Sequence, residues 1–94
     1  MTLNRTISAL ADQNRRKILE LLKKKDMSVN ELATNFDISL PSLSHHLGKL
    51  KEADLVSAQR QGQQIIYSLN LSIFEEIAQE LYSFFNSKKY GKPR

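Results

Sequence analysis

One stretch, SLPSLSHHLGKLK at positions 39–51, decides the fold of this 94-residue chain. On an α-helix, which turns about 100° per residue, its leucines fall on one narrow face. These leucines are Leu40, Leu43, Leu47 and Leu50. Ser39 precedes the pattern as a good N-cap, and Pro41 lies in the first turn, where a proline loses no hydrogen bond. The stretch therefore predicts an amphipathic helix that packs its leucines on a core.

The opposite face of this predicted helix is short, polar and free of acidic residues. It carries Pro41, Ser42, His45 and Lys49, with Ser44 and His46 at its flanks. Serine and histidine side chains can donate hydrogen bonds to phosphates and base edges in the major groove of DNA. A solvent-exposed face on an ordinary core helix would have a similar composition. The neighbouring segments decide between these two interpretations.

Composition limits the possible architecture and the possible partners. A chain of 94 residues with 40% hydrophobic content forms one domain with a modest core, which helical proteins of this size often share with a second copy. The net charge of +4 suits a nucleic-acid partner. The absence of cysteine excludes disulfides and thiolate metal sites. With no apolar run of signal-peptide or membrane-spanning length, we expect a cytoplasmic protein with one domain over residues 1–87 and a disordered basic tail over 88–94.

The segments before the leucine-rich stretch predict three further helices. Residues 3–11 form a short first helix, and Asp12 caps a second helix that ends in the lysine run 23–25, where cations favour the helix dipole. Ser28 and Glu31 form a capping box that begins a short third helix. This third helix and the leucine-rich helix, joined by a few residues, predict a helix-turn-helix unit.

The residues after the leucine-rich helix predict a β-hairpin. Segments 55–60 and 64–69 are rich in β-branched and aromatic residues, and Gly62 between them supplies a positive φ. The side chains at its tip are Arg60, Gln61, Gln63 and Gln64. Such side chains can enter a minor groove or hold phosphates. A hairpin directly after a helix-turn-helix makes a winged helix, which favours the DNA interpretation.

The last segment predicts a helix over residues 73–87 that begins with a second capping box, Ser72 and Glu75. Its apolar residues cover more of the circumference than one core-facing stripe needs, so we predict a twofold dimer through the first and last helices. The predicted interface residues are Leu3, Ile7, Leu10, Ile77, Leu81, Phe84 and Phe85. The predicted fold is mainly α with a small β-hairpin, in the order α-α-α-α-β-β-α.

Together these segments resemble the ArsR/SmtB family of winged-helix repressors over residues 4–86. The similarity lies in residues 42–50 with 53–56, and in the wing over 60–63 and 66–69. Within the family the chain is most similar to the SdpR-type autorepressor group, which shares the Ser-His-His-Leu segment and the lack of cysteine. The resemblance implies a homodimeric transcriptional repressor that binds an inverted-repeat operator. It also implies autorepression and relief of repression by a membrane-protein partner that sequesters the repressor.

The pattern and the resemblance together give the predicted DNA-binding residues. They are Ser39, Pro41, Ser42, Ser44, His45, His46, Lys49, Arg60, Gln61, Gln63 and Gln64. The recognition helix would lie in the major groove and the wing at the flanking backbone or minor groove. Ser42 and His45 lie most directly opposite the leucines, so we expect them to face base edges. Ser44 and His46 lie nearer the rim, where phosphates are the expected partners.

Neither a metal site nor an active site is predicted. Metal sensors of the family use cysteines, or Asp, His and Glu ligands on the last helix, whereas this last helix offers only Glu75, Glu76 and Glu80. Carboxylates alone make a poor zinc site, and the adjacent His45 and His46 point about 100° apart. No acid or nucleophile accompanies the histidines, so we expect no enzyme and no cofactor. The alternative function is an interaction module of winged-helix fold that docks a partner through its terminal helix.

Overall fold

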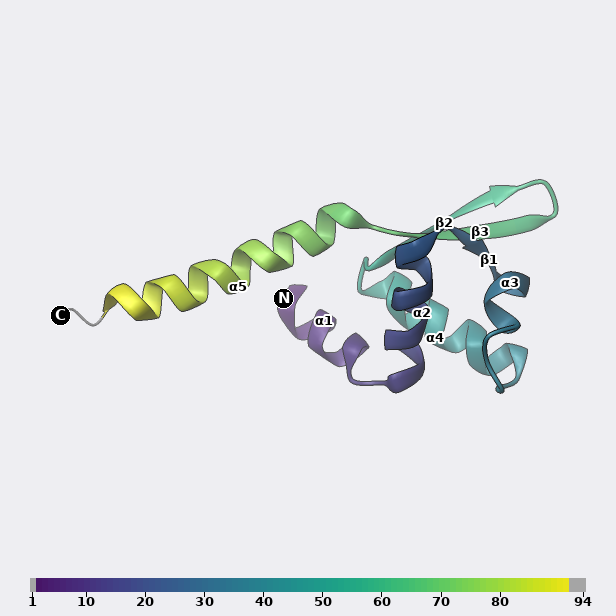
Figure 1. The fold of residues 1–94 in the computed structure, drawn as a ribbon, viewed down its shortest axis with the longest axis horizontal. Helices are drawn as coiled ribbons and strands as arrows, with labels where there is room; N and C mark the ends of the chain where they lie inside the picture. Colours follow the sequence, from purple (N-terminus) through teal and green to yellow (C-terminus); the bar gives the residue numbers. More distant parts are fainter. Residues whose placement is uncertain (1, 92–94) are drawn as a thin grey trace.

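The computed structural model describes residues 2–91, and it describes the side chains of residues 3–86. Within these residues the elements are α1 (Thr2–Leu10), α2 (Gln13–Lys24), β1 (Met27–Ser28), α3 (Val29–Ala33), α4 (Leu40–Glu52), β2 (Val56–Gln61), β3 (Gln64–Leu69) and α5 (Leu71–Gly91). The arrangement confirms the predicted winged-helix architecture (Figure 1). The sequence missed β1, because a strand of two residues has no alternating pattern to recognise.

Three side chains begin the helices α2, α3 and α4, as predicted. Asp12 is the N-cap of α2, and Ser39 is the N-cap of α4, where its hydroxyl accepts a hydrogen bond from the N–H of Ser42 at 3.2 Å. The capping box of α3 is complete. Ser28 Oγ accepts from the N–H of Glu31 at 3.1 Å, and Glu31 Oε1 accepts from the N–H of Ser28 at 2.9 Å. Each cap satisfies backbone donors that the first turn of a helix leaves without partners.

The end of α4 is fixed by a left-handed residue. Asp54 has φ 62°, and its N–H donates to the carbonyl of Lys51 at 2.9 Å. The N–H of Leu55 donates to the carbonyl of Leu50 at 3.0 Å, which completes a Schellman-type ending. The side-chain amide of Asn70 donates to the carbonyl of Asp54 at 2.9 Å. The end of α4 is thereby tied to the end of the hairpin.

The sheet is antiparallel, with strand order β1-β3-β2. Met27 pairs with Tyr67 and Ser28 with Ile66, so the central strand β3 joins the wing to the segment that begins α3. β2 pairs with β3 along its whole length, and Gly62, with φ 64°, makes the turn between them. The tip of the hairpin extends beyond the helices at the end of the molecule opposite α5 (Figure 1).

The core lies between α2, α3, α4 and the base of the wing. Its largest fully buried side chains are Ile18, Leu32, Leu43, Leu47, Leu50 and Leu55. Each such side chain contributes about 1.5–3 kcal/mol when it is fully buried. Three of the four leucines of α4 are therefore in the core as predicted. The fourth is not: Leu40 is 53% exposed, because as the first residue of α4 it precedes the turns that pack on the core.

Helix α5 extends away from the rest of the chain and makes the molecule 58 Å long, against 24 and 22 Å in the other directions (Figure 1). The predicted cap at Ser72 is wrong. The helix begins at Leu71, and the N–H of Ile73 donates to the carbonyl of Asn70 at 3.2 Å. The helix continues to Gly91, so residues 88–91, which we expected in a disordered tail, are helical; residues 92–94 lie outside the described residues. No helix in residues 2–91 is long and apolar enough to span a membrane.

Candidate nucleic-acid interface

The outward face of α4 carries most of the predicted DNA-binding residues. Those exposed on α4 or at its N-cap are Ser39, Pro41, Ser44, His45 and Lys49, and Ser42 is half-buried. Because the leucines on the other side of α4 are buried in the core, this face points to solvent. The face itself contains no carboxylate; the nearest one on the helix is Glu52, which pairs with Lys49 at 3.9 Å. The result is a neutral to basic polar surface that does not repel a polyanion.

The structure corrects the position of His46. We expected it at the rim of the groove face, but its side chain is only 11% exposed and its Nδ1 lies 3.4 Å from an Arg15 guanidinium nitrogen and 3.8 Å from Asp12 Oδ1. Both partners come from the beginning of α2, 31 or more residues away in the sequence. A helical wheel of α4 alone cannot show that His46 is buried, because the two side chains that contact it come from another helix.

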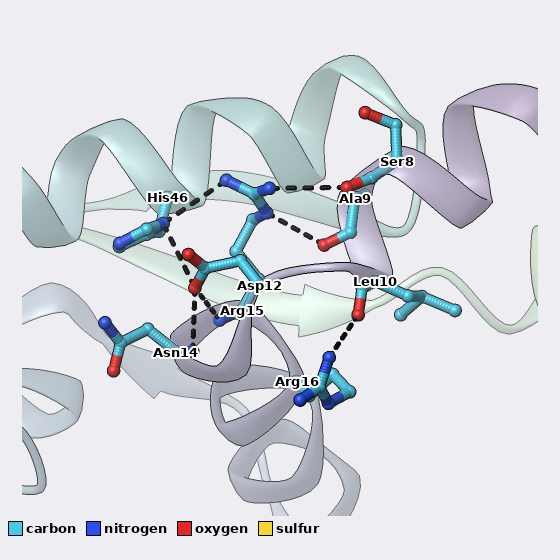
Figure 2. A network of polar contacts seen from close by, with 8 residues as sticks. All are labelled: Ser8, Ala9, Leu10, Asp12, Asn14, Arg15, Arg16 and His46. Carbon is cyan, nitrogen blue, oxygen red and sulfur yellow. Dashed lines mark hydrogen bonds and ion pairs between the residues drawn. The ribbon is translucent and has the colours of Figure 1, made fainter.

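Arg15 is the residue that the sequence analysis missed. Its Nε donates to the carbonyl of Ala9 at 2.8 Å, and a terminal nitrogen donates to the carbonyl of Ser8 at 3.3 Å (Figure 2). The same guanidinium contacts His46, so one side chain of α2 joins the end of α1 to α4. In the sequence Arg15 is one of several basic residues of α2, and no local spacing distinguishes it from its neighbours.

Asp12 supports the same network. Burial raises the pKa of its carboxyl, but hydrogen bonds from the backbone N–H groups of Arg15 and Asn14 and the neighbouring side chains of His46 and Arg15 outweigh it and hold that pKa below the ordinary value of 3.8. The carboxylate Oδ1 accepts from the N–H of Asn14 at 2.7 Å and of Arg15 at 3.1 Å (Figure 2). The ionised form is thus the one that the folded chain stabilises.

The tip of the wing presents the predicted polar side chains to solvent. Those exposed there are Arg60, Gln61, Gln63 and Gln64. The ladder of β2 and β3 continues to the last pair before the turn, Gln61 with Gln64, so these side chains stand on paired backbone. Two distinct polar elements therefore face solvent: the outward face of α4 and the tip of the hairpin.

The residues predicted at a dimer interface divide into three groups. Ile7, Leu81, Phe84 and Phe85 are exposed, at 60%, 40%, 62% and 63%. Leu3 and Leu10 are half-buried and pack on the core. Ile77, at 7% exposed, is a core residue of its own chain, which corrects the prediction that it faces a second copy. Among the described residues no group of three or more His, Cys, Asp or Glu side chains is placed to hold a metal ion.

The sequence and the fold both match known regulatory proteins. Residues 12–58 match the profile of the family described as "Bacterial regulatory protein, arsR family". The chain is 44% identical over 84 residues to the "Transcriptional repressor SdpR" of Bacillus subtilis strain 168, covering 89% of this chain and 93% of that protein. These matches agree with the expectation that the chain is not an enzyme.

Solved structures give the same result for the fold. An ArsR-like transcriptional regulator from Rhodococcus sp. RHA1 superposes with a TM-score of 0.87 at 27% identity, covering 94% of this chain and 83% of that one. A domain from Mycobacterium bovis, described as a homodimeric winged helix-turn-helix DNA-binding domain, superposes with a TM-score of 0.73 at 26% identity, covering 99% and 86%.

Proposed function

Because this chain belongs to the arsR family of bacterial regulatory proteins, we propose that it is a dimeric, sequence-specific DNA-binding transcriptional repressor. The observation that carries the proposal is the outward face of α4. It is polar, contains no carboxylate, and is held away from the core by three buried leucines. A face of this kind meets the requirements of a helix that lies in the major groove.

His45 and Ser42 are the proposed base-reading residues. His45 is exposed and lies nearly opposite the buried leucines, so its ring points toward the floor of the groove when α4 lies in it. Ser39 and Ser44 are exposed beside it and are placed to donate to phosphates. At the wing, Arg60 and its neighbouring glutamines would meet the flanking phosphates or the minor groove.

The proposed dimer forms through α5 and α1. Ile73, Ile77, Leu81 and Phe84 follow one stripe of α5 at the spacing i, i+4, i+8, i+11. Exposure rises along this stripe from buried Ile77 to 40% at Leu81 and 62% at Phe84, as α5 leaves its own domain. A second copy that covers this apolar continuation would place two recognition helices on a twofold axis, which requires an inverted-repeat operator. The Mycobacterium bovis domain of the same fold is described as homodimeric.

Repression is supported by the likeness to the Bacillus subtilis protein, which is named as a transcriptional repressor. A dimer that occupies an operator excludes other proteins from the same DNA. Autorepression is the more specific form of the proposal, so the promoter of the gene that encodes this chain is the first DNA to test. The search then extends to genomic fragments that the protein retains.

Two variants test how the chain would bind its operator. His45→Ala should weaken operator binding by about 1–3 kcal/mol and binding to scrambled DNA much less, because it removes a base-reading side chain. Arg60→Ala should weaken binding to both duplexes alike and should lower the salt slope by about one unit for each phosphate that the side chain neutralises. Both side chains are exposed, so both variants should unfold like wild type. Binding titrations on both duplexes at several salt concentrations measure these effects.

The outcome that contradicts this orientation is an equal loss of affinity on both duplexes for both variants. A protein that retains no genomic fragment above the background of scrambled DNA, yet captures a partner through α5, would instead support the alternative function. In that case the winged helix would serve as an interaction module, and the apolar stripe of α5 would be its docking face.

A further inference from the structure

The guanidinium of Arg15 is the one group among the described residues of α2 that bonds to both α1 and α4. It donates to two carbonyls at the end of α1, those of Ala9 at 2.8 Å and Ser8 at 3.3 Å. A third nitrogen lies 3.4 Å from Nδ1 of His46 on α4 (Figure 2). The planar guanidinium holds several donors in a fixed fork, so these bonds define the position of one helix relative to the other.

The interaction with Arg15 determines which tautomer of His46 fits. A guanidinium has donors and no acceptor, so Nδ1 of His46 must supply a lone pair, and the proton of the neutral ring is then on Nε2. The other charged group that faces the ring is Asp12, whose Oδ1 lies 3.8 Å from the same Nδ1, beyond hydrogen-bond distance. On α4 itself the neighbour is His45, whose ring centroid lies 5.8 Å away.

The position of His46 on α4 gives this bond a consequence for the exposed face. His46 follows His45 directly, so the two side chains leave the helix about 100° apart. A bond that holds His46 against α2 therefore sets the rotation of α4 about its axis at the point where the proposed base-reading residue projects. Without that bond the leucines still keep α4 on the core, but apolar packing is not directional and defines rotation less sharply.

We infer that Arg15 is a positioning residue for DNA reading: it fixes the rotation of the recognition helix by bridging the end of α1 to Nδ1 of His46. The inference rests on the proposed function. It makes Arg15 a determinant of specificity although the side chain is half-buried and directed inward. Since α1 also carries the exposed Ile7 of the proposed dimer face, the bridge joins that face to the DNA-reading helix.

The chain offers a matched pair of variants. Arg15→Lys keeps the charge but cannot reach both the α1 carbonyls and His46 with a planar fork. Arg16→Lys is the control, because Arg16 donates to the carbonyl of Leu10 at 2.6 Å, also at the end of α1, and among the described residues it bonds to none of α4. Arg15→Lys should reduce the ratio of operator to scrambled-DNA affinity roughly 5- to 150-fold, the range that one base-reading interaction spans, with the salt slope unchanged. Arg16→Lys should leave the ratio at the wild-type value.

Two further measurements separate positioning from a general loss of structure. His46→Asn keeps an acceptor near the place of Nδ1 and should retain most of the ratio, whereas His46→Ala removes the acceptor and should lower the ratio about as much as Arg15→Lys does. In wild type, nitrogen-15 NMR should show Nδ1 of His46 as a nitrogen without a proton that accepts a hydrogen bond, and in Arg15→Lys the Nδ1 chemical shift should move toward that of a nitrogen without this bond while the dimer persists. These readouts would not respond to a merely stabilising role.

An Arg15→Lys protein with a wild-type ratio, or an Nδ1–H tautomer in the wild type, would overturn the inference. Equal reductions in the Arg15→Lys and Arg16→Lys proteins would overturn it as well, since they would reflect the end of α1 in general. These failures differ from failure of the proposed function, in which the wild-type protein itself would show no preference for any operator.

Discussion

Removing one aromatic ring from the apolar stripe of α5 should separate the proposed dimer into monomers that remain folded. Phe84 is 62% exposed on its own chain. Full burial of a phenylalanine side chain contributes up to about 3 kcal/mol, so a second copy that covers the exposed part gains about 2 kcal/mol. In a twofold dimer the residue occurs twice, which gives about 4 kcal/mol if coverage is complete and about 2 kcal/mol if it is half complete. Phe84→Ala should therefore raise the dimer dissociation constant roughly 30- to 1,000-fold.

Sedimentation equilibrium over a wide range of chain concentrations measures this dissociation constant. Tyr82→Ala is the control: Tyr82 lies on the same helix and is 72% exposed, but it is about 160° around the helix from Phe84 and off the stripe. The Tyr82→Ala protein should dimerise like wild type. A change of less than about threefold in the Phe84→Ala protein, or equal changes in both proteins, would refute the assignment of this stripe to the dimer. The far-ultraviolet circular dichroism of both variants should match that of wild type, because neither ring is in the core.

Two predictions concern stability within one chain. Ser28→Ala should lower the free energy of unfolding by about 1 kcal/mol, measured in urea, because it removes the acceptor for the N–H of Glu31; an unchanged midpoint would mean that water satisfies this donor equally well. The pKa of Asp12 is lower in the folded chain than its ordinary value of 3.8, so its carboxylate stabilises the fold at neutral pH, and this contribution disappears as the pH falls below that value through the folded pKa. The difference in stability between wild type and Asp12→Asn should therefore shrink as the pH is lowered over this interval, and a difference independent of pH would contradict the assignment.

Local chemistry made the helix starts predictable from the sequence. Asp12, Ser28 and Ser39 act on backbone donors two or three residues away, so the pattern that specifies each cap lies within one helical turn. The turn at Gly62 was predictable for a similar reason, because a positive φ is readily available only to glycine and a few small polar residues. The β-branched and aromatic residues of the wing strands and the spacing of the leucines of α4 are local signals of the same kind.

The interior of the candidate site was not predictable, because it depends on pairs that are distant in sequence. His45 and His46 are adjacent and chemically identical, and the feature that separates them is Arg15, 31 residues before His46. The predicted start of α5 was wrong for a related reason. Ser72 and Glu75 have the spacing of a capping box, but Asn70 donates to the carbonyls of residues 54 and 55 at the end of α4, and the helix begins immediately after it.

The two-residue strand β1 has a mechanical consequence for the wing. β3 is supported on both sides at Ile66 and Tyr67, whereas nearer the turn it is supported by β2 alone. The base of the hairpin is thus paired on both sides of β3. From Ile65 to the turn, β3 is paired with β2 alone, and this part of the hairpin includes Arg60. The base of the hairpin is paired with Ser28, which also caps α3. The pairing therefore fixes the distance between the base of the wing and the helices α3 and α4. If the wing contacts DNA as proposed, the part beyond β1 is the part that can adjust to variations in groove width, while the base of the wing keeps its position relative to α3.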